Sequence, residues 1–236
     1  MTGLAILLPP SEGKADGGRA PAFASDCGRF GPALATQRAA LIAALAAAGG
    51  GDQRLLGTGG KQLERGLAAN RALFGAPTLP ASRRYTGVVH GAIAYPTLSA
   101  AARRRARESI VIVSGLLGLV ALDDPVPDYR LKMGARLDPF GLVSRAWREP
   151  LSAALNAWLA GRTVVDLLPG EHAAAWLPDP GLDLVRVTFE ERNGRVAGHD
   201  AKAAKGQLVR HLLTSRAAPR RALQAWRHDR FDLRLS

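Results

Sequence analysis

The residues best suited to chemistry form one stretch in the middle of the chain. A run of four apolar residues at 110–113 predicts a buried strand, and Ser114 follows it in a small-residue turn. The loop beyond carries a phenol, two guanidinium groups and an ammonium group, those of Tyr129, Arg130, Lys132 and Arg136. Open α/β sheets bind ligands at the carboxyl ends of their strands, so this loop suits a phosphate, a carboxylate or a base stacked on a sugar. The alternative is a surface loop whose basic side chains are only solvated.

Further basic side chains lie in segments that leave or flank other predicted strands. The full set is Lys14, Arg130, Lys132, Arg136, Lys202 and Lys205. If these strand ends share one edge of a sheet, the groups converge on a cleft, and a cleft lined by one sign of charge attracts anions. The alternative is that each side chain faces solvent independently. We expect convergence, and with it a cationic binding cleft.

A second set of residues offers stacking and acid–base chemistry: Tyr85, Ser114, Tyr129, Glu171 and His172. A tyrosine can stack on a base or donate a proton. Glu171 and His172 could act as an acid–base pair beside a cationic site. If the protein is an enzyme, Glu171, His172 and Tyr129 are therefore the catalytic candidates. The structural alternatives are a half-buried Tyr129 that caps a turn, and a Glu171 that pairs with a nearby arginine.

The segment LLGTGGKQL at 55–63 resembles the centre of a helix-hairpin-helix. Gly57 and Gly59 would let backbone N–H groups approach a phosphate, and Lys61 would add a charged contact. Such hairpins hold the nucleic-acid backbone without reading its sequence. The alternative is a helix end followed by an ordinary turn.

Several common sites have no matching motif in this sequence. There is no Ser-His-Asp spacing, no Cys/His metal set, no phosphate-binding P-loop and no GxGxxG after the first strand. We therefore expect neither a metal nor a cofactor. Cys27 is the single cysteine, which rules out an intrachain disulfide and fits a reducing compartment. The apolar run at 4–8 is too short for a membrane span, so we expect a cytoplasmic protein without a membrane partner.

Charge points to a polyanionic partner. Lys and Arg number 32 against 20 Asp and Glu, a net charge of +12, and apolar residues make up 47% of the 236 residues. This balance favours a polyanion such as nucleic acid, and the partner that we expect is nucleic acid or an anionic small molecule. The alternative is a compositional bias towards arginine. The apolar content allows one sizeable domain spanning 1–236.

Hydrophobic periodicity predicts a mixed α/β (α+β) fold, with a central mixed sheet flanked by helices and a helical hairpin at about 38–74. Pro150 is expected to divide the helix at 143–159, and Asn193-Gly194 to turn a hairpin. No internal repeat or coiled coil is present. Strands are predicted at 4–8, 85–89, 110–113, 164–168, 185–190 and 196–199, and helices at 38–48, 98–108, 143–159 and 206–214. Two more helices, joined by the turn at 57–59, are predicted over 53–74.

Five ordered segments resemble the YaaA family of peroxide-stress proteins. They are LLPPSEGK at 7–14, YTGV at 85–88, SGLLGL with DYRLKMGARL at 114–137, VVDLLPGEHAAAW at 164–176, and KAAKGQLVR at 202–210. The acidic loop departs from the family, with Gly170 and His172 where Ser and Tyr are usual. Five matches in order are far more specific than one short motif.

The resemblance implies protection of DNA and proteins from hydrogen peroxide, and a helix-hairpin-helix-like element near 53–74. Two hypotheses follow. In the first, the protein binds nucleic acid, in particular double-stranded DNA, through the basic cleft and the hairpin. In the second, it is an enzyme acting on a nucleoside, a nucleotide or another phosphorylated small molecule in the same cleft.

Overall fold

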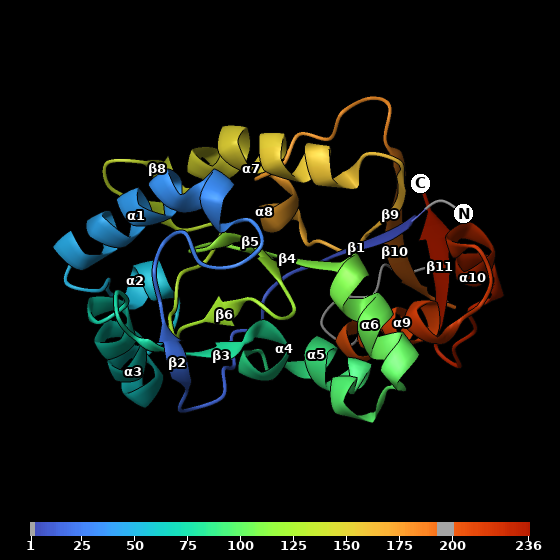
Figure 1. Ribbon diagram of the computed structural model, residues 1–236, viewed down its shortest axis with the longest axis horizontal. Helices are drawn as coiled ribbons and strands as arrows, with labels where there is room; N and C mark the ends of the chain where they lie inside the picture. The colour runs from blue at the N-terminus through green and yellow to red at the C-terminus, as the bar shows by residue number, and fades with distance from the viewer. Residues whose placement is uncertain (1–2, 193–200) are drawn as a thin grey trace.

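A mixed six-stranded sheet forms the centre of the protein (Figure 1). The computed structural model describes residues 3–192 and 201–236. The strand order is β11-β10-β9-β1-β4-β5, and β10, β9, β1 and β4 are parallel while the two edge strands are antiparallel. The strands are β1 (Gly3–Leu8), β4 (Ile110–Ser114), β5 (Gly118–Ala121), β9 (Arg162–Asp166), β10 (Asp183–Glu191) and β11 (Phe231–Leu235). The predicted α/β class with a central mixed sheet is confirmed.

The middle strands are apolar because helices cover both of their faces. In β1 and β4, Ile6 pairs with Ile110, and on the other side of β1 it pairs with Val165 of β9. All three side chains are fully buried, as is the rest of β4. This parallel register brings the carboxyl ends of β1, β4 and β9 to one edge of the sheet, where the loops after them can meet.

Two layers of helices enclose the sheet (Figure 1). On one side α7 (Val143–Leu159) packs on β5 and β9 beside α1 (Gly31–Ala47). On the other side α6 (Ala100–Ser109) packs on β1 and contacts α9 (Ala201–Thr214). The helix α9 also packs against α5 (Val88–Ile93) and α10 (Pro219–Ala225).

The remaining elements form a lobe beside the sheet and the connections to it. The helices α2 (Gln53–Leu56) and α3 (Gly60–Arg71) pack together, and α3 also contacts α1. The small elements are β2 (Arg19–Ala22), β3 (Pro77–Pro80), α4 (Ala81–Arg84), η1 (Tyr95–Thr97), β6 (Pro125–Val126), β7 (Arg136–Leu137), β8 (Gly141–Leu142) and α8 (Gly170–Ala173). Within the described ranges, no helix combines the length and the apolarity that a bilayer crossing requires.

Two predicted elements are wrong. The segment 85–89 is not a strand, because Tyr85 makes only an isolated bridge with Lys14 and the helix α5 begins at Val88. Pro150 does not divide its helix, and α7 is continuous. Trp147, Leu151 and Leu155 are fully buried at helical spacing on one face of α7, and this packing outweighs the single hydrogen bond that the proline lacks.

The predicted hairpin around Asn193-Gly194 and its strand at 196–199 lie outside the described residues. The antiparallel partner of β10 in the described chain is β11, where Val187 pairs with Leu235. Helices were found at the other predicted places, with different ends: α1 begins at Gly31, α6 spans Ala100–Ser109 and α9 begins at Ala201.

Candidate functional site

A pocket of about 330 Å³ lies beside the ends of β1 and β9. It is bounded by the loop after β1, the loop after β9, the start of α5 and the segment that follows Tyr129. Its lining residues are 9–14, 87–90, 129–132, Pro169, Glu171, His172 and Lys202. Four basic and two acidic side chains therefore share one hollow, and they come from segments distant in sequence.

The pocket brings together seven of the predicted site residues: Lys14, Tyr129, Arg130, Lys132, Glu171, His172 and Lys202. The common cause is the parallel order of β1 and β9, which places the lysine loop opposite the acidic loop. The segment that follows Tyr129 packs directly against the backbone of Gly115. A Cβ added at Gly115 would lie 2.7 Å from the Leu131 carbonyl oxygen.

Lys14 lies over two tyrosine rings. Its Nζ is 4.3 Å from the centre of the Tyr129 ring and 5.8 Å from that of Tyr85, and it donates a hydrogen bond of 3.2 Å to the Ser11 carbonyl oxygen. Burial lowers the pKa of Lys14 to about 8, although the Asp128 carboxylate acts in the opposite direction. The amine is thus much closer to losing its proton at neutral pH than an ordinary lysine.

Three buried hydroxyl groups form a chain behind Lys14. The Tyr129 hydroxyl is 2.8 Å from that of Tyr85 and 2.7 Å from that of Ser114, which accepts a hydrogen bond from the Leu117 N–H. Burial raises the pKa of Tyr129 to about 12 and that of Tyr85 well above its ordinary value. Both phenols remain protonated at physiological pH, and the chain holds the two rings under Lys14. Tyr85 and Ser114 support the pocket and do not line it.

Arg130 joins the pocket to the helical lobe. Its guanidinium group contacts Glu12 at 3.1 Å and donates to the Leu56 carbonyl oxygen at 3.1 Å. The buried side chain of Asn70 in α3 bonds both the N–H and the carbonyl oxygen of Arg130, at 2.9 and 2.8 Å, and also donates to the Gly50 carbonyl oxygen. One side chain therefore ties the pocket wall to α3.

The His172 imidazole has one nitrogen without a hydrogen-bond partner among the described residues. The side chain is buried, and this nitrogen is Nδ1. The nearest acidic oxygen, Oε1 of Glu171, is 3.7 Å away, which is too far for a hydrogen bond. Burial, followed by the charge of Lys205, lowers the pKa of His172 to about 4, so the imidazole is neutral. A buried nitrogen without a partner needs an explanation, and an ordered water molecule beside it is the simplest one.

The predicted turn between two helices is present at 57–59. Asp52 caps α2 by accepting a hydrogen bond of 2.7 Å from the Leu55 N–H, and Gly57 adopts a left-handed φ of 61°. A Cβ at Gly57 would lie 2.2 Å from Nζ of Lys132, so the turn meets the pocket edge, and the left-handed φ favours glycine there. Gly59 and Lys61 are exposed on the outer side of the turn.

Two predicted residues lie elsewhere. Arg136 is exposed on β7 and lines a different surface hollow, bordered by Asp52 and Arg54. Lys205 lies behind the loop that follows β9, where it donates a hydrogen bond of 2.7 Å to the Leu167 carbonyl oxygen. Burial lowers its pKa, and its role in the structure is to fix the loop that carries Glu171.

Sequence reasoning missed two residues that shape the site. His90 lines the pocket, its Nε2 is 3.2 Å from the Pro9 carbonyl oxygen, and burial lowers its pKa to about 4. Arg84 is fully buried and bonds the carbonyl oxygens of Ala15 and Gly17, which lie just after Lys14. His90 follows the matched YTGV segment by two positions, a usable signal, whereas Arg83-Arg84 reads as an ordinary basic surface pair.

No group of three or more His, Cys, Asp or Glu side chains suited to a metal ion occurs in the ranges 3–192 and 201–236.

Comparison with known proteins gives the family of the chain. A family model described as peroxide stress protein YaaA matches residues 4–235. A UPF0246 protein of Streptomyces coelicolor is 35% identical over 221 residues, covering 91% of this chain and 84% of that protein. A UPF0246 protein of Corynebacterium efficiens is 34% identical over 224 residues, covering 93% of this chain and 88% of that protein. The match spans both the pocket and the hairpin, and the chain belongs to the peroxide stress protein YaaA family.

Proposed function

We propose that this protein binds double-stranded DNA during the response to hydrogen peroxide, using the pocket and the α2–α3 hairpin as one surface. The observation that carries the proposal is the meeting of Lys14, Arg130, Lys132 and Lys202 in one hollow with the hairpin turn at its edge. The family description supports a role in peroxide stress. The free cysteine, Cys27, supports a cytoplasmic location.

The chemistry of the two parts is complementary. The exposed turn offers Gly59 and Lys61 to one phosphate of the DNA backbone. The charged groups of the pocket would contact phosphates further along the same DNA strand. None of these contacts reads a base edge by itself. The net charge of +12 favours a polyanion over a single small anion. We therefore expect binding with little sequence preference and a strong dependence on salt.

The test is duplex binding measured by fluorescence anisotropy at several salt concentrations. Lys61→Ala and Lys202→Ala should each weaken binding for every sequence tried and lower the salt slope by about 1, because each removes one phosphate contact. Arg104→Ala, which removes an exposed charge on α6, is the matched control and should leave both the affinity and the slope unchanged. Affinity that stays flat from low to high salt would exclude phosphate-driven binding.

A second candidate function is an enzyme that acts on a nucleotide or another phosphorylated small molecule. The observation favouring it is the combination of a lysine with a pKa of about 8 and the unpaired His172 nitrogen in one pocket. A backbone binder has little need for either group. A thermal-shift screen of nucleotides, nucleosides and sugar phosphates separates the two functions, because a ligand bound only by the folded state raises its stability. Selective stabilisation by one compound, without duplex binding, would favour the enzyme.

A further inference from the structure

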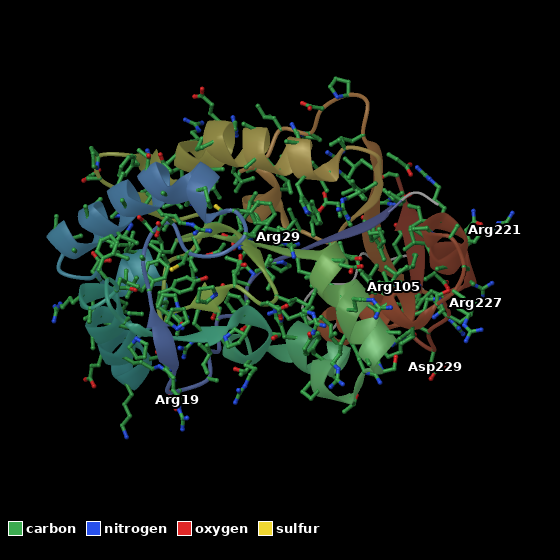
Figure 2. The ribbon with its side chains drawn as sticks, in the orientation of Figure 1. Arg19, Arg29, Arg105, Arg221, Arg227 and Asp229 are labelled. Atoms are coloured by element: carbon green, nitrogen blue, oxygen red, sulfur yellow. The ribbon has the colours of Figure 1, made fainter. Side chains whose placement is uncertain are left out.

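The distribution of lysine in this chain is unusual. The sequence has 27 arginines and only 5 lysines, yet Lys14, Lys132 and Lys202 all line the pocket. Many arginines lie on the outside, as Arg19 on one side and Arg221 and Arg227 on the other illustrate (Figure 2). Arginine binds phosphate at least as well as lysine does, but it stays charged, whereas lysine can lose its proton and act as a nucleophile. Three of the five lysines line the pocket beside Arg130, whereas Lys61 and Lys205 lie outside it.

Among these three, Lys14 has the surroundings of a nucleophile. Its amine rests against the Tyr129 ring, and the Ser11 carbonyl oxygen fixes its direction. No described carboxylate lies within ion-pair distance of it, and the more distant Asp128 carboxylate raises its pKa by less than burial lowers it. With a pKa of about 8, about a tenth of Lys14 is neutral at pH 7, roughly 300 times the fraction of an ordinary lysine. Desolvated lysines of this kind form Schiff bases with carbonyl compounds.

We propose that Lys14 forms an imine with the aldehyde of a phosphorylated sugar, and that the open-chain sugar of an abasic site in DNA is the favoured source. The DNA source depends on the proposed nucleic-acid binding, whereas the imine chemistry does not. In the step, the neutral amine attacks the aldehyde carbon and a C–N bond forms. The carbonyl oxygen leaves as water with the two amine protons, and no electrons are exchanged with another molecule.

The rest of the pocket fits this substrate class. Arg130 and Lys202 can hold the phosphate. The lip carries Val88, whose residue surface is 53% exposed, and this apolar contact suits a sugar face. A volume of about 330 Å³ is small for a ligand site and matches a sugar phosphate without a base.

The experiment is reductive trapping with sodium borohydride, which delivers hydride to the imine and makes the bond permanent. The full chain is incubated with a duplex containing one abasic site, and in a second arm with deoxyribose 5-phosphate. The expected result is a covalent adduct whose mass-mapped position is Lys14. Lys14→Arg, which keeps the charge but not the nucleophile, should lower the yield at least tenfold while its thermal melting remains cooperative.

Random capture by an exposed amine is controlled with Arg104→Lys, which adds a lysine on the surface of α6 away from the pocket. Its yield should equal that of the unmodified protein, and the Lys14→Arg/Arg104→Lys double variant should trap as little as Lys14→Arg. Full trapping by the double variant, or an adduct mapped to another lysine, overturns the inference.

The two arms separate this inference from the proposed function. Tight binding of an intact duplex with no trapping in either arm refutes the imine and leaves DNA binding standing. Trapping of deoxyribose 5-phosphate with no duplex binding supports the imine at Lys14 and refutes the DNA source. Trapping of the abasic duplex in preference to the free sugar supports both.

Discussion

The buried guanidinium group of Arg84 is predicted to hold the lysine loop in place. Its Nε donates to the Val126 carbonyl oxygen at 3.0 Å, and its other nitrogens donate to Ala15, to Gly17 at 2.9 Å and to Pro77 at 3.3 Å. The residue is 0% exposed. We therefore consider Arg84→Met, which keeps an unbranched chain of similar length and removes every donor.

The expected loss in the free energy of unfolding is about 2.5–7.5 kcal/mol. The Val126 carbonyl is left unsatisfied inside the protein, at about 1–3 kcal/mol, while the loop carbonyls can turn to water and lose only the net value of their bonds, about 0.5–1.5 kcal/mol each. Urea unfolding followed by tryptophan fluorescence measures the change. Because the loop after Lys14 is released, the Lys14 adduct yield in the trapping assay should fall as well.

The neighbouring Arg83 is the matched control. It is exposed, and Arg83→Met should change the free energy of unfolding by no more than about 0.5 kcal/mol. The reasoning is refuted if Arg84→Met lowers the free energy of unfolding by less than about 1 kcal/mol, or if the two variants are equally destabilised. In either case the four hydrogen bonds of Arg84 do not stabilise the fold as proposed.

Two further predictions concern the glycines and the histidines. Gly115→Ala should destabilise the protein by about 1–3 kcal/mol in urea unfolding, because the new Cβ would lie 2.7 Å from the Leu131 carbonyl oxygen, whereas Gly91→Ala in α5, with open space around it, should be neutral or stabilising by up to about 1 kcal/mol. Equal effects would contradict the packing at Gly115. His90 has a folded pKa of about 4 against an unfolded value near 6.5, so the unfolded state takes up protons first and stability is lost as the pH falls below about 6.5. Between pH 7 and pH 5 the contribution of His90 to the free energy of unfolding should fall by about 2 kcal/mol. The measurement is the difference between the unmodified protein and His90→Gln, whose side chain does not titrate. Parallel pH profiles of stability for the two proteins would refute this prediction.

Local sequence signals predicted the centre of the fold well. The strand β4 was predictable because four branched apolar residues end at the Ser114-Gly115 turn, and α9 because its apolar residues recur at helical spacing. The strand β11 was missed although Phe231, Leu233 and Leu235 alternate with polar residues, a period-two signal that was readable. The error at 85–89 had another cause: β-branched residues at Val88 and Val89 favour a strand locally, but the fold places them in the short helix α5 against α9.

The sequence indicated which types of residue the candidate site contains, but not which of the predicted residues come together in the pocket. Lys14 meets Glu171 because β1 pairs with β9, and Lys202 joins them because α9 packs against α5; the sequence specifies neither contact. Arg136 was grouped with Arg130 by proximity along the chain, but the β7–β8 hairpin turns it to another surface. The pairing of Tyr85 with Tyr129 joins residues 44 positions apart and had no local signal.

The central place of β1 has a consequence for how the protein is made. This strand is synthesised early, yet its neighbours β4 and β9 begin at residues 110 and 162. Until β4 has left the ribosome, the row Ile6, Leu7 and Leu8 has no strand to pair with, and until β9 follows, its other side stays open. Long-range parallel pairing of this kind folds slowly and leaves apolar edges open to aggregation. Nascent chains that stop before β9 should therefore depend on chaperones, which would make translation speed through the first 166 residues a determinant of yield.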